Sequence, residues 1–384
     1  MANIQILALD AARTGGAGVY TSKLIHALHN RGHNITLICH EAEDSVKKVA
    51  KVFEIPRPFT HFRLGMWRLS ALIQIKHYRK YLKSLNLSEQ SIVFASAQPM
   101  TWPYHTLYPN RALIYIPHSL VAPVELKSYE YGDKLQRVIA VATYEYLEKK
   151  CLKHAKTTIR FTETACLALR NYYGRSIAKN FSVLPMPIEV GPPNERNRQN
   201  QAIRLLSVGR LIKTKNLQFL LDLLSKKVDL DWHLDIVGTG DEKESLERFV
   251  LLNRLTEHIT FHGHCDDVKP FYRSSDMFVF PSLLESFGLV LIEAMSQSLP
   301  SLSFRPDGVR FLTASDEFIV HNVSGLLAKD ENDFEILLNA VLTRQIDLPV
   351  MGAAGRANIK LNHQWDSHIE KIEELVNIYG IPST

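Results

Sequence analysis

Short apolar runs alternate with amphipathic stretches along the first part of the chain. Residues 4–9 and 35–39 form apolar runs typical of buried strands, and residues 19–31 between them place apolar side chains at helical spacing. A glycine-rich turn precedes this helix, and residues 91–96 and 112–116 are further candidate strands. The succession of strand, glycine turn, helix and strand predicts the start of a parallel α/β sheet.

The same alternation starts again after a polar stretch between residues 191 and 200. We expect strands at residues 203–208, 233–237, 259–261 and 277–280, and helices at residues 216–224, 242–253 and 289–296. Two such series predict an α/β protein of two Rossmann-like, doubly wound domains. Ligands of such sheets bind beyond the carboxyl ends of the strands, so we expect a binding site in an interdomain cleft.

The polar stretch also suggests where the domains meet. We expect an N-terminal domain over residues 1–188, a linker over residues 189–200 and a C-terminal domain over residues 201–364. A last helix, at about residues 365–384, is expected to pack back on the N-terminal domain.

The composition is that of a soluble globular protein of two domains. Of the 384 residues, 46% are hydrophobic and 22% are charged, and no apolar run approaches the roughly 20 residues that a membrane-spanning helix needs. The first strand has no basic region before it, so we expect no signal peptide. Scattered cysteines at positions 39, 151, 166 and 265 favour a cytoplasmic protein without a disulfide framework.

Charge is distributed unevenly between the two halves of the chain. Residues 1–180 contain 25 Lys and Arg against 12 Asp and Glu, a net charge of +13, whereas residues 181–384 contain 20 against 28, a net charge of −8. This asymmetry favours an anionic partner for the basic half, and a solvated basic surface is the alternative.

The segment from Pro281 to Met295 combines a helix start with two carboxylates. Gly288 precedes the expected helix, so the N–H groups of Gly288, Leu289 and Val290 would face an anion such as a diphosphate. Glu285 and Glu293 are eight residues apart, at most about 12 Å if helical, which suits the distance from the sugar to the ribose of a nucleotide-sugar. The alternative is a pair of solvated glutamates.

A second segment, residues 207–216, begins at the carboxyl end of the expected strand at 203–208. It carries Arg210 and Lys215, whose guanidinium and ammonium groups are suited to binding two phosphates. Two cations there could stabilise a leaving diphosphate without a metal ion. The alternative is a surface loop with ordinary cations.

Together, the two segments resemble the retaining family-4 glycosyltransferases of the GT-B fold. That family has a serine–x–glycine–arginine stretch leading to lysine–asparagine, and then a Glu-x7-Glu motif, which runs here from Glu285 to Glu293. Residues 236–240, 261–263 and 324–327 are similar to further landmarks of the family. The resemblance covers most of residues 203–327, with five landmarks in order.

The resemblance implies a hexosyltransferase that acts with retention of configuration, and the cations of Arg210 and Lys215 favour a reaction without a metal ion. Its donor would be a nucleotide-sugar and its acceptor a glycan or lipid-linked hydroxyl, in the synthesis of a cell-envelope polysaccharide or glycolipid. Glu285 would contact the donor sugar, Glu293 the ribose, and Arg210 with Lys215 the diphosphate.

The N-terminal half matches the family at two places. The segment from Thr14 to Gly18, with Gly15 and Gly16 at its centre, resembles the family's glycine loop, which lies against the donor phosphates. His118 follows the expected strand at 112–116 and resembles a histidine that meets the transferred sugar. A lone histidine is more often structural, and that alternative stays open for His118.

Two places depart from the family's pattern and leave the identity of the donor open. The chain has Pro185-Met186-Pro187-Ile188-Glu189 where relatives often have Pro-Asn-Gly-Ile-Asp. It has Arg305-Pro306-Asp307-Gly308 near the position where relatives commonly carry a glycine pair.

Other motifs argue against a metal or a cofactor. Asp229-Leu230-Asp231 is formally a metal–diphosphate motif, but it precedes a strand instead of following one. The stretch His262-Gly263-His264-Cys265 has no second ligand pair at zinc-like spacing. We therefore expect no metal and no cofactor.

Two other functions are alternatives to a glycosyltransferase. A catalytically silent nucleotide-sugar-binding protein could use the same fold, although all four of Arg210, Lys215, Glu285 and Glu293 are present. A nucleic-acid-binding protein would suit the basic half, but no motif of that class is found, so we expect no nucleic-acid partner.

A basic segment over residues 62–83 predicts peripheral docking on an anionic membrane. It carries six Lys and Arg, no acid and many aromatic and aliphatic residues, with residues 62, 66, 69 and 73 at helical spacing. Such a helix suits the headgroup boundary, here at the inner face of the cytoplasmic membrane. The same apolar stripe could instead pack on the protein's own sheet.

Overall fold

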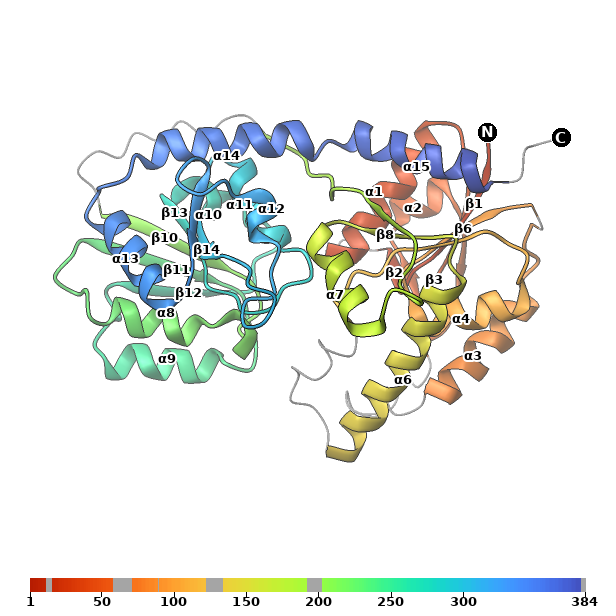
Figure 1. Ribbon diagram of the computed structural model, residues 1–384, viewed down its shortest axis with the longest axis horizontal. Coiled ribbons are helices and arrows are strands. Elements are labelled where there is room, and N and C mark those ends of the chain that lie inside the picture. Colours follow the sequence, from red (N-terminus) through yellow and green to blue (C-terminus); the bar gives the residue numbers. More distant parts are fainter. Residues whose placement is uncertain (12–15, 58–70, 89, 122–133, 192–201, 381–384) are drawn as a thin grey trace. The chain divides into compact units, whose positions relative to one another are not determined.

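The computed structural model describes the chain except residues 12–15, 58–70, 89, 122–133, 192–201 and 381–384. The chain divides into two compact units (Figure 1). Unit 1 consists of Met1–Pro185 and Asp366–Thr384, and unit 2 of Met186–Trp365.

Unit 1 is built on a seven-stranded parallel sheet with the strand order β5-β3-β1-β6-β7-β8-β9. Its strands are β1 (Asn3–Leu7), β3 (Asn34–Cys39), β5 (Lys51–Glu54), β6 (Ile92–Ala95), β7 (Leu113–Tyr115), β8 (Thr157–Arg160) and β9 (Phe181–Val183), and β2 (Asp10–Ala11) pairs with β4 (Glu41–Ala42) beside it. Its helices are α1 (Gly16–Asn30), α2 (Asp44–Val49), α3 (Ala71–Ser84), α4 (Gln98–Leu107), α6 (Lys134–His154), α7 (Glu163–Tyr173) and α15 (Trp365–Tyr379). The central strands are buried along nearly their whole length because helices cover both faces of the sheet.

Unit 2 has a six-stranded parallel sheet with the order β12-β11-β10-β13-β14-β15. Its strands are β10 (Ile203–Val208), β11 (Trp232–Val237), β12 (Ile259–Gly263), β13 (Met277–Phe280), β14 (Ser301–Phe304) and β15 (Gly325–Ala328). Its helices are α8 (Leu217–Leu224), α9 (Lys243–Leu252), α10 (Lys269–Ser274), α11 (Leu289–Ser296), α12 (Ser315–Phe318), α13 (Glu331–Leu342) and α14 (Leu348–Asn362), with the 3-10 turn η2 (Lys213–Lys215).

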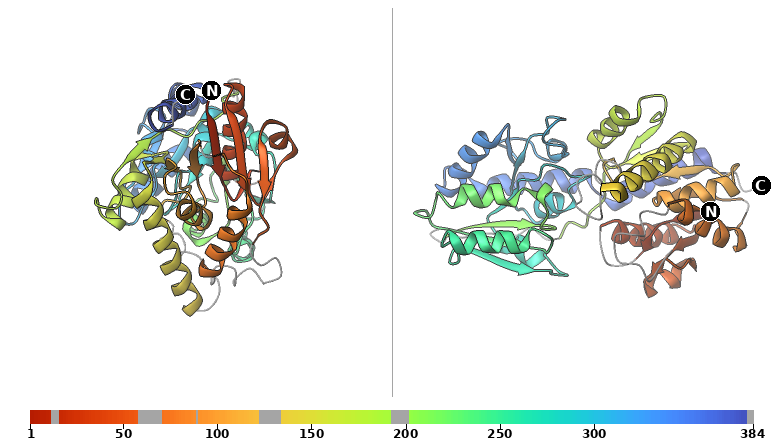
Figure 2. Two further views of the ribbon diagram at one scale, coloured as in Figure 1. Left: turned by 90° about the vertical axis from the view of Figure 1, so that its right-hand side faces the viewer. Right: turned by 90° about the horizontal axis from the view of Figure 1, so that it is seen from below.

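Both units have the doubly wound architecture that the hydrophobic pattern predicts, so the expected fold class of two Rossmann-like domains is confirmed. The strands expected at residues 203–208 and 277–280 and the helix at 289–296 have those bounds in the structure. In unit 2, α8, α9 and α13 cover one face of the sheet through a single apolar cluster (Figure 2).

The ends of β10 and β11 approach each other backbone to backbone. Gly209 N donates to Val237 O at 3.0 Å, and Leu211 N donates to Thr239 O at 2.8 Å. A Cβ atom on Gly238 would lie 1.9 Å from the carbonyl oxygen of Gly209, and one on Gly240 would lie 2.3 Å from that of Leu211. Both positions therefore require glycine, and their contact fixes the start of the loop that carries Arg210.

The C-terminal helix α15 belongs to unit 1 and is joined to α1. Tyr20 Oη donates a hydrogen bond to His368 Nε2 at 2.9 Å, and His33 of the following turn contacts Glu373 at 3.0 Å. His368 Nδ1 donates to the carbonyl oxygen of Pro185 at 3.0 Å. Pro185 is the last residue of the first segment of unit 1. No disulfide joins the cysteines, three of which are buried, and none of the described helices is both long and apolar enough to cross a bilayer.

We expect Gly238→Ala to destabilise the protein by roughly 3 kcal/mol, because the new methyl group would overlap a backbone carbonyl that cannot move away alone. The matched control is Gly263→Ala, at the end of the neighbouring strand, where φ is +70° and nothing lies within 4 Å of the added atom. That control should cost only about 1 kcal/mol. Denaturant midpoints followed by tryptophan fluorescence measure both changes, and equal shifts in the two variants would contradict the steric argument.

Candidate functional site

The candidate site of unit 2 lies where its strand order reverses, between β10 and β13. The loops after these neighbouring strands leave the carboxyl edge of the sheet side by side, which is the usual ligand position in doubly wound folds. A small pocket lies there, lined by residues 207–211, 280–282, Lys215 and Leu217. Arg210 and Lys215 thus line one pocket, and the Arg210 side chain is exposed.

Lys215 and Glu285 are brought together although 70 positions separate them in the chain. The Lys215 ammonium forms an ion pair with Glu285 Oε1, and each side chain is only 16% exposed. Leu283 N donates to Thr214 O at 2.8 Å, so a backbone hydrogen bond joins the two loops beside the ion pair. The ammonium also lies 5.6 Å from the centre of the Phe280 ring.

A third loop holds Glu285 from the other side. Glu285 N donates to Leu312 O at 2.9 Å, and Leu312 N donates to Leu283 O at 2.7 Å. Glu285 is therefore fixed by its main chain, independently of the ion pair made by its carboxylate.

Asp307 ties this third loop into a closed turn. Its Oδ1 accepts hydrogen bonds from the N–H groups of Val309, Arg310 and Phe311 at 2.7–2.9 Å, and these bonds, that from Phe311 above all, lower the pKa of its carboxyl group. Phe311 stacks on Phe304 with ring centres 4.1 Å apart. The sequence marks this segment as a departure from the family's glycine pair, but does not reveal that Asp307 organises it.

The helix start expected near Gly288 lies where the sequence places it. Gly288 has φ +83° and ψ +48°, a left-handed conformation that favours glycine, and α11 begins at Leu289. A Cβ atom at Gly288 would make only ordinary contacts, so its backbone conformation is the reason for glycine here. Leu289 and Val290 are half-buried, and their N–H groups belong to the first helical turn, which lacks intrahelical acceptors.

Glu293 has a partner that the sequence does not reveal. Tyr272 of α10 donates from its Oη to Glu293 Oε2 at 3.0 Å. Tyr272 is 1% exposed, and burial, with Glu293 beside it, raises its pKa well above the ordinary value, so the hydroxyl remains a donor. Tyr272 therefore fixes the direction of the Glu293 carboxylate.

Of the N-terminal candidates, Gly16 and His118 lie in unit 1, and Gly15 is outside the described residues. Gly16 is the first residue of α1. His118 follows β7 at the carboxyl edge of the sheet, half-buried between the rings of Tyr20 at 5.6 Å and Phe161 at 5.7 Å. Burial lowers the pKa of His118 to about 4, and the charge of Arg160 adds to this shift. The imidazole is therefore neutral near pH 7.

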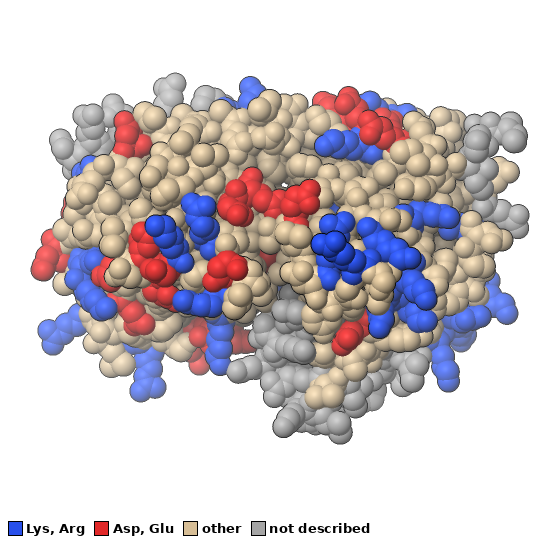
Figure 3. Space-filling model, viewed as in Figure 1, with Lys and Arg blue, Asp and Glu red and all other residues tan. Residues whose placement is uncertain are grey.

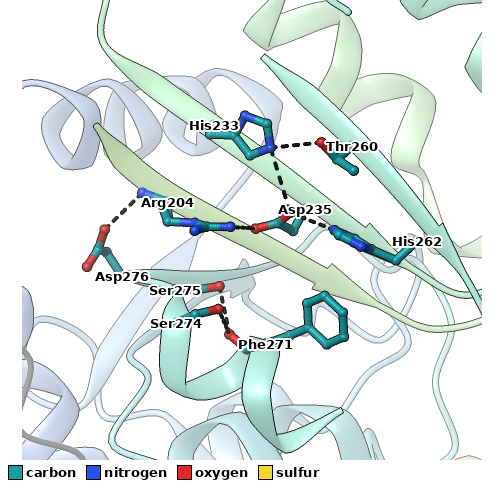
Figure 4. A network of polar contacts seen from close by, with 9 residues as sticks. All are labelled: Arg204, His233, Asp235, Thr260, His262, Phe271, Ser274, Ser275 and Asp276. Carbon is teal, nitrogen blue, oxygen red and sulfur yellow. Dashed lines mark hydrogen bonds and ion pairs between the residues drawn. The ribbon is translucent and has the colours of Figure 1, made fainter. Parts of the chain in front are cut away.

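The histidine-rich stretch at the end of β12 takes part in a polar network (Figure 4). His262 Nε2 donates to Asp235 Oδ1 at 2.7 Å, and Arg204 contacts the other oxygen of Asp235 at 2.6 Å. Burial opposes ionisation of Asp235, which is 2% exposed, but hydrogen bonds from His262 and Arg204 outweigh it and lower its pKa. Within the part of the chain that the structure describes, no group of three or more His, Cys, Asp or Glu is arranged to hold a metal ion.

Two family models match successive parts of the chain. The model of Glycosyltransferase Family 4 matches residues 14–191, and the model of Glycosyl transferases group 1 matches residues 193–357. The match with an uncharacterised glycosyltransferase of Haemophilus influenzae is 32% identical over 39% of this chain and 43% of that relative's length. The match with the amylovoran biosynthesis glycosyltransferase AmsD of Erwinia amylovora is 25% identical over 86% of this chain and 92% of AmsD.

Solved structures share the fold of the whole chain at low sequence identity. Sucrose-phosphate synthase from Thermosynechococcus elongatus aligns over 98% of both chains with a TM-score of 0.78 and 18% identity. HepE from Anabaena, solved in complex with UDP-glucose, aligns over 98% of this chain and 99% of that one with a TM-score of 0.68 and 15% identity. The chain belongs to the family-4, group 1 glycosyltransferases and has the GT-B fold.

Proposed function

We propose that this glycosyltransferase moves a hexosyl unit from a nucleotide-sugar to an acceptor hydroxyl, with retention of configuration and without a metal ion. The observation that carries the proposal is the meeting of Lys215, Glu285 and the Arg210 loop at the strand-order reversal of unit 2. The UDP-glucose complex of HepE and the biosynthetic role in the name of AmsD support a nucleotide-sugar donor and a cell-envelope polysaccharide or glycolipid product.

In this proposal the diphosphate of the donor is bound by cations and by backbone N–H groups. Arg210 and Lys215 supply the charge, and the first turn of α11 supplies the N–H groups of Leu289 and Val290. Lys215 exchanges its contact with Glu285 for a phosphate oxygen when the donor binds. Gly15 and Gly16 lie against the same phosphates, a role assigned on the resemblance.

The two glutamates and His118 bind the sugar and the ribose. Glu285, once Lys215 has turned to the phosphate, accepts hydrogen bonds from hydroxyl groups of the transferred sugar. Glu293, oriented by Tyr272, accepts from the ribose hydroxyls. Neutral His118 can accept from or donate to a sugar hydroxyl. As the donor bond breaks, Arg210 and Lys215 stabilise the negative charge that develops on the leaving diphosphate.

We also propose that the basic face of unit 1 docks on an anionic membrane from the cytoplasmic side and receives a lipid-linked acceptor. Of the basic segment, residues 62–70 lie outside the described residues, and α3 carries Lys76, Arg79, Lys80 and Lys83, all exposed and with no acid on the helix. Helices α3, α4 and α6 pack on one another, and the face of unit 1 seen in Figure 3 carries many more cations than acids. Lys150 of α6 lies over the rings of Trp102 and Tyr146, so aromatic side chains accompany the cations of the basic face of unit 1.

The reaction itself is tested by incubating the enzyme with UDP-, GDP- and ADP-sugars and measuring donor hydrolysis with and without EDTA. We expect hydrolysis of at least one donor, undiminished by EDTA, and an NMR spectrum of the first product that shows the donor's anomeric configuration. An inverted product would contradict retention, and activity restored only by Mg²⁺ or Mn²⁺ would contradict metal independence. Binding of a donor without any turnover would favour the catalytically silent alternative.

The proposed site predicts that loss of either cation weakens diphosphate binding, whereas loss of the Glu285 carboxylate lowers kcat. Arg210→Ala and Lys215→Ala should each weaken the binding of the nucleoside diphosphate by roughly 1.5–3 kcal/mol, through loss of a charge-assisted contact. Glu285→Ala should lower kcat by roughly 100-fold or more and leave diphosphate affinity equal or higher, because it removes a sugar contact and releases Lys215. Calorimetric titration and kcat measure the two effects.

Lys213→Ala is the matched control for the two cations, since Lys213 is an exposed lysine in the same 3-10 turn as Lys215. It should keep the affinity of the parent enzyme. Unchanged affinity in both Arg210→Ala and Lys215→Ala would remove these residues from the diphosphate site, and normal turnover in Glu285→Ala would remove Glu285 from the sugar site.

Membrane docking predicts co-sedimentation with phosphatidylglycerol vesicles that is lost in high salt. Changing Arg79, Lys80 and Lys83 to serine should weaken vesicle binding by about 100-fold, at about 1 kcal/mol for each cation removed. The control changes three exposed lysines of unit 2, Lys226, Lys329 and Lys360, and should bind as the parent does. Equal recovery in the supernatant with and without anionic vesicles would indicate a soluble acceptor.

A further inference from the structure

The buried residue Arg160 is hydrogen-bonded to the main chain of the loop that carries His118. Arg160 is the last residue of β8 and is 2% exposed. Its Nη1 donates to the carbonyl oxygen of Pro117 at 2.8 Å, and its Nη2 donates to that of Leu120 at 3.3 Å. One planar guanidinium group thus holds the two main-chain carbonyls on either side of His118.

The sheet brings Arg160 to this loop. Tyr115 of β7 pairs with Thr158 of β8, so Pro117, two residues further along, comes beside Arg160. Arg160 itself pairs with Val183 of β9 on its other side. The neighbouring residues of β8 are buried too, and an arginine in such a position costs free energy unless its N–H groups find acceptors. The carbonyls of the His118 loop are such acceptors.

The imidazole of His118 is held by rings from the elements around it. Phe161, the residue after Arg160, stacks on it at 5.7 Å, and Tyr20 of α1 contacts it edge to face at 5.6 Å. Tyr20 is in turn hydrogen-bonded to His368 of α15. Burial raises the pKa of Tyr20 and lowers that of His368 to about 4, so both groups are neutral near pH 7. The charged group that adds to the low pKa of His118 is Arg160.

We propose that Arg160 is a positioning residue of the transferase reaction, which fixes the 117–120 loop so that the His118 imidazole meets the transferred sugar. This inference rests on the proposed function of His118 as a contact of the donor sugar. Arg160 acts through the main chain of the loop and through the field of its charge, and it does not contact the substrate.

Two substitutions distinguish the hydrogen bonds that Arg160 makes to the loop from the effect of its positive charge. Arg160→Lys keeps the charge, but one ammonium cannot reproduce the planar fork that spans two carbonyls. Arg160→Met removes both. We expect kcat to fall about 10- to 100-fold in both variants, because His118 would no longer be held in position to contact the sugar. The affinity for the nucleoside diphosphate should stay unchanged within twofold. The pKa of His118, followed by NMR, should stay low in Arg160→Lys and rise only in part in Arg160→Met, because burial, the larger cause of the low pKa, remains in both variants.

The matched control is Arg111→Met. Arg111 is another buried arginine of unit 1, lies before β7 at the amino edge of the same sheet, and binds Leu87 O and the side chain of Gln5. The substitution Arg111→Met should lower the denaturant midpoint of unfolding, whereas kcat and the pKa of His118 should stay as in the parent enzyme. A change in kcat or in the His118 titration in this control as large as in Arg160→Met would show a general loss of structure and overturn the proposal.

A double-mutant cycle with His118→Ala distinguishes the two proposals. If Arg160 acts through His118, then Arg160→Met causes no further loss of kcat when His118 is already alanine. Equal losses in both backgrounds, or full kcat in Arg160→Met beside an impaired His118→Ala, would overturn the role of Arg160. Full kcat in His118→Ala itself would instead overturn the proposed function of His118.

Discussion

The site of unit 2 depends on a place where two stretches of main chain touch with no room for a side chain. The ends of β10 and β11 meet at Gly238 and Gly240, where a single added carbon would overlap the carbonyl groups of Gly209 and Leu211. Because the contact is between backbones, the path of the Arg210 loop is set by hydrogen bonds and sterics and does not rely on flexible side chains. A cation on such a loop is presented by a rigid support.

The same principle extends to the carboxylate that faces this loop. The main chain of Glu285 is hydrogen-bonded to Leu312 of the third loop, and Leu283, two residues earlier, is hydrogen-bonded to Thr214. The Lys215–Glu285 ion pair therefore joins two side chains whose backbones are already fixed. Breaking this ion pair would move two side chains and leave the loops in place, so the proposed exchange with a donor would occur in a preorganised electrostatic environment.

The sequence predicts most of unit 2 because its signals are local. The strands at 203–208 and 277–280 are short apolar runs, and Gly288 marks the start of α11, so strand, loop and helix follow from neighbours along the chain. The sequence does not predict the contacts of Tyr272 with Glu293 and of Arg160 with Pro117, because each contact joins residues that no periodic pattern connects. Asp307 lies at a departure from the family pattern, but its three hydrogen bonds depend on a turn that no repeating pattern in the sequence indicates. The sequence thus predicts the loops but not the side-chain contacts that hold them.

The chain leaves unit 1 at Pro185 and returns to it at Asp366, so unit 1 is assembled from two distant segments. His368 connects them: it binds the carbonyl oxygen of Pro185 and the hydroxyl group of Tyr20, 348 positions earlier in the chain. During synthesis on the ribosome, which proceeds from the N-terminus, all of unit 2 is made before His368 exists. The hydrogen bond that closes α1 onto α15 can therefore form only after the whole of unit 2 has been synthesised, so Tyr20 lacks this partner until then.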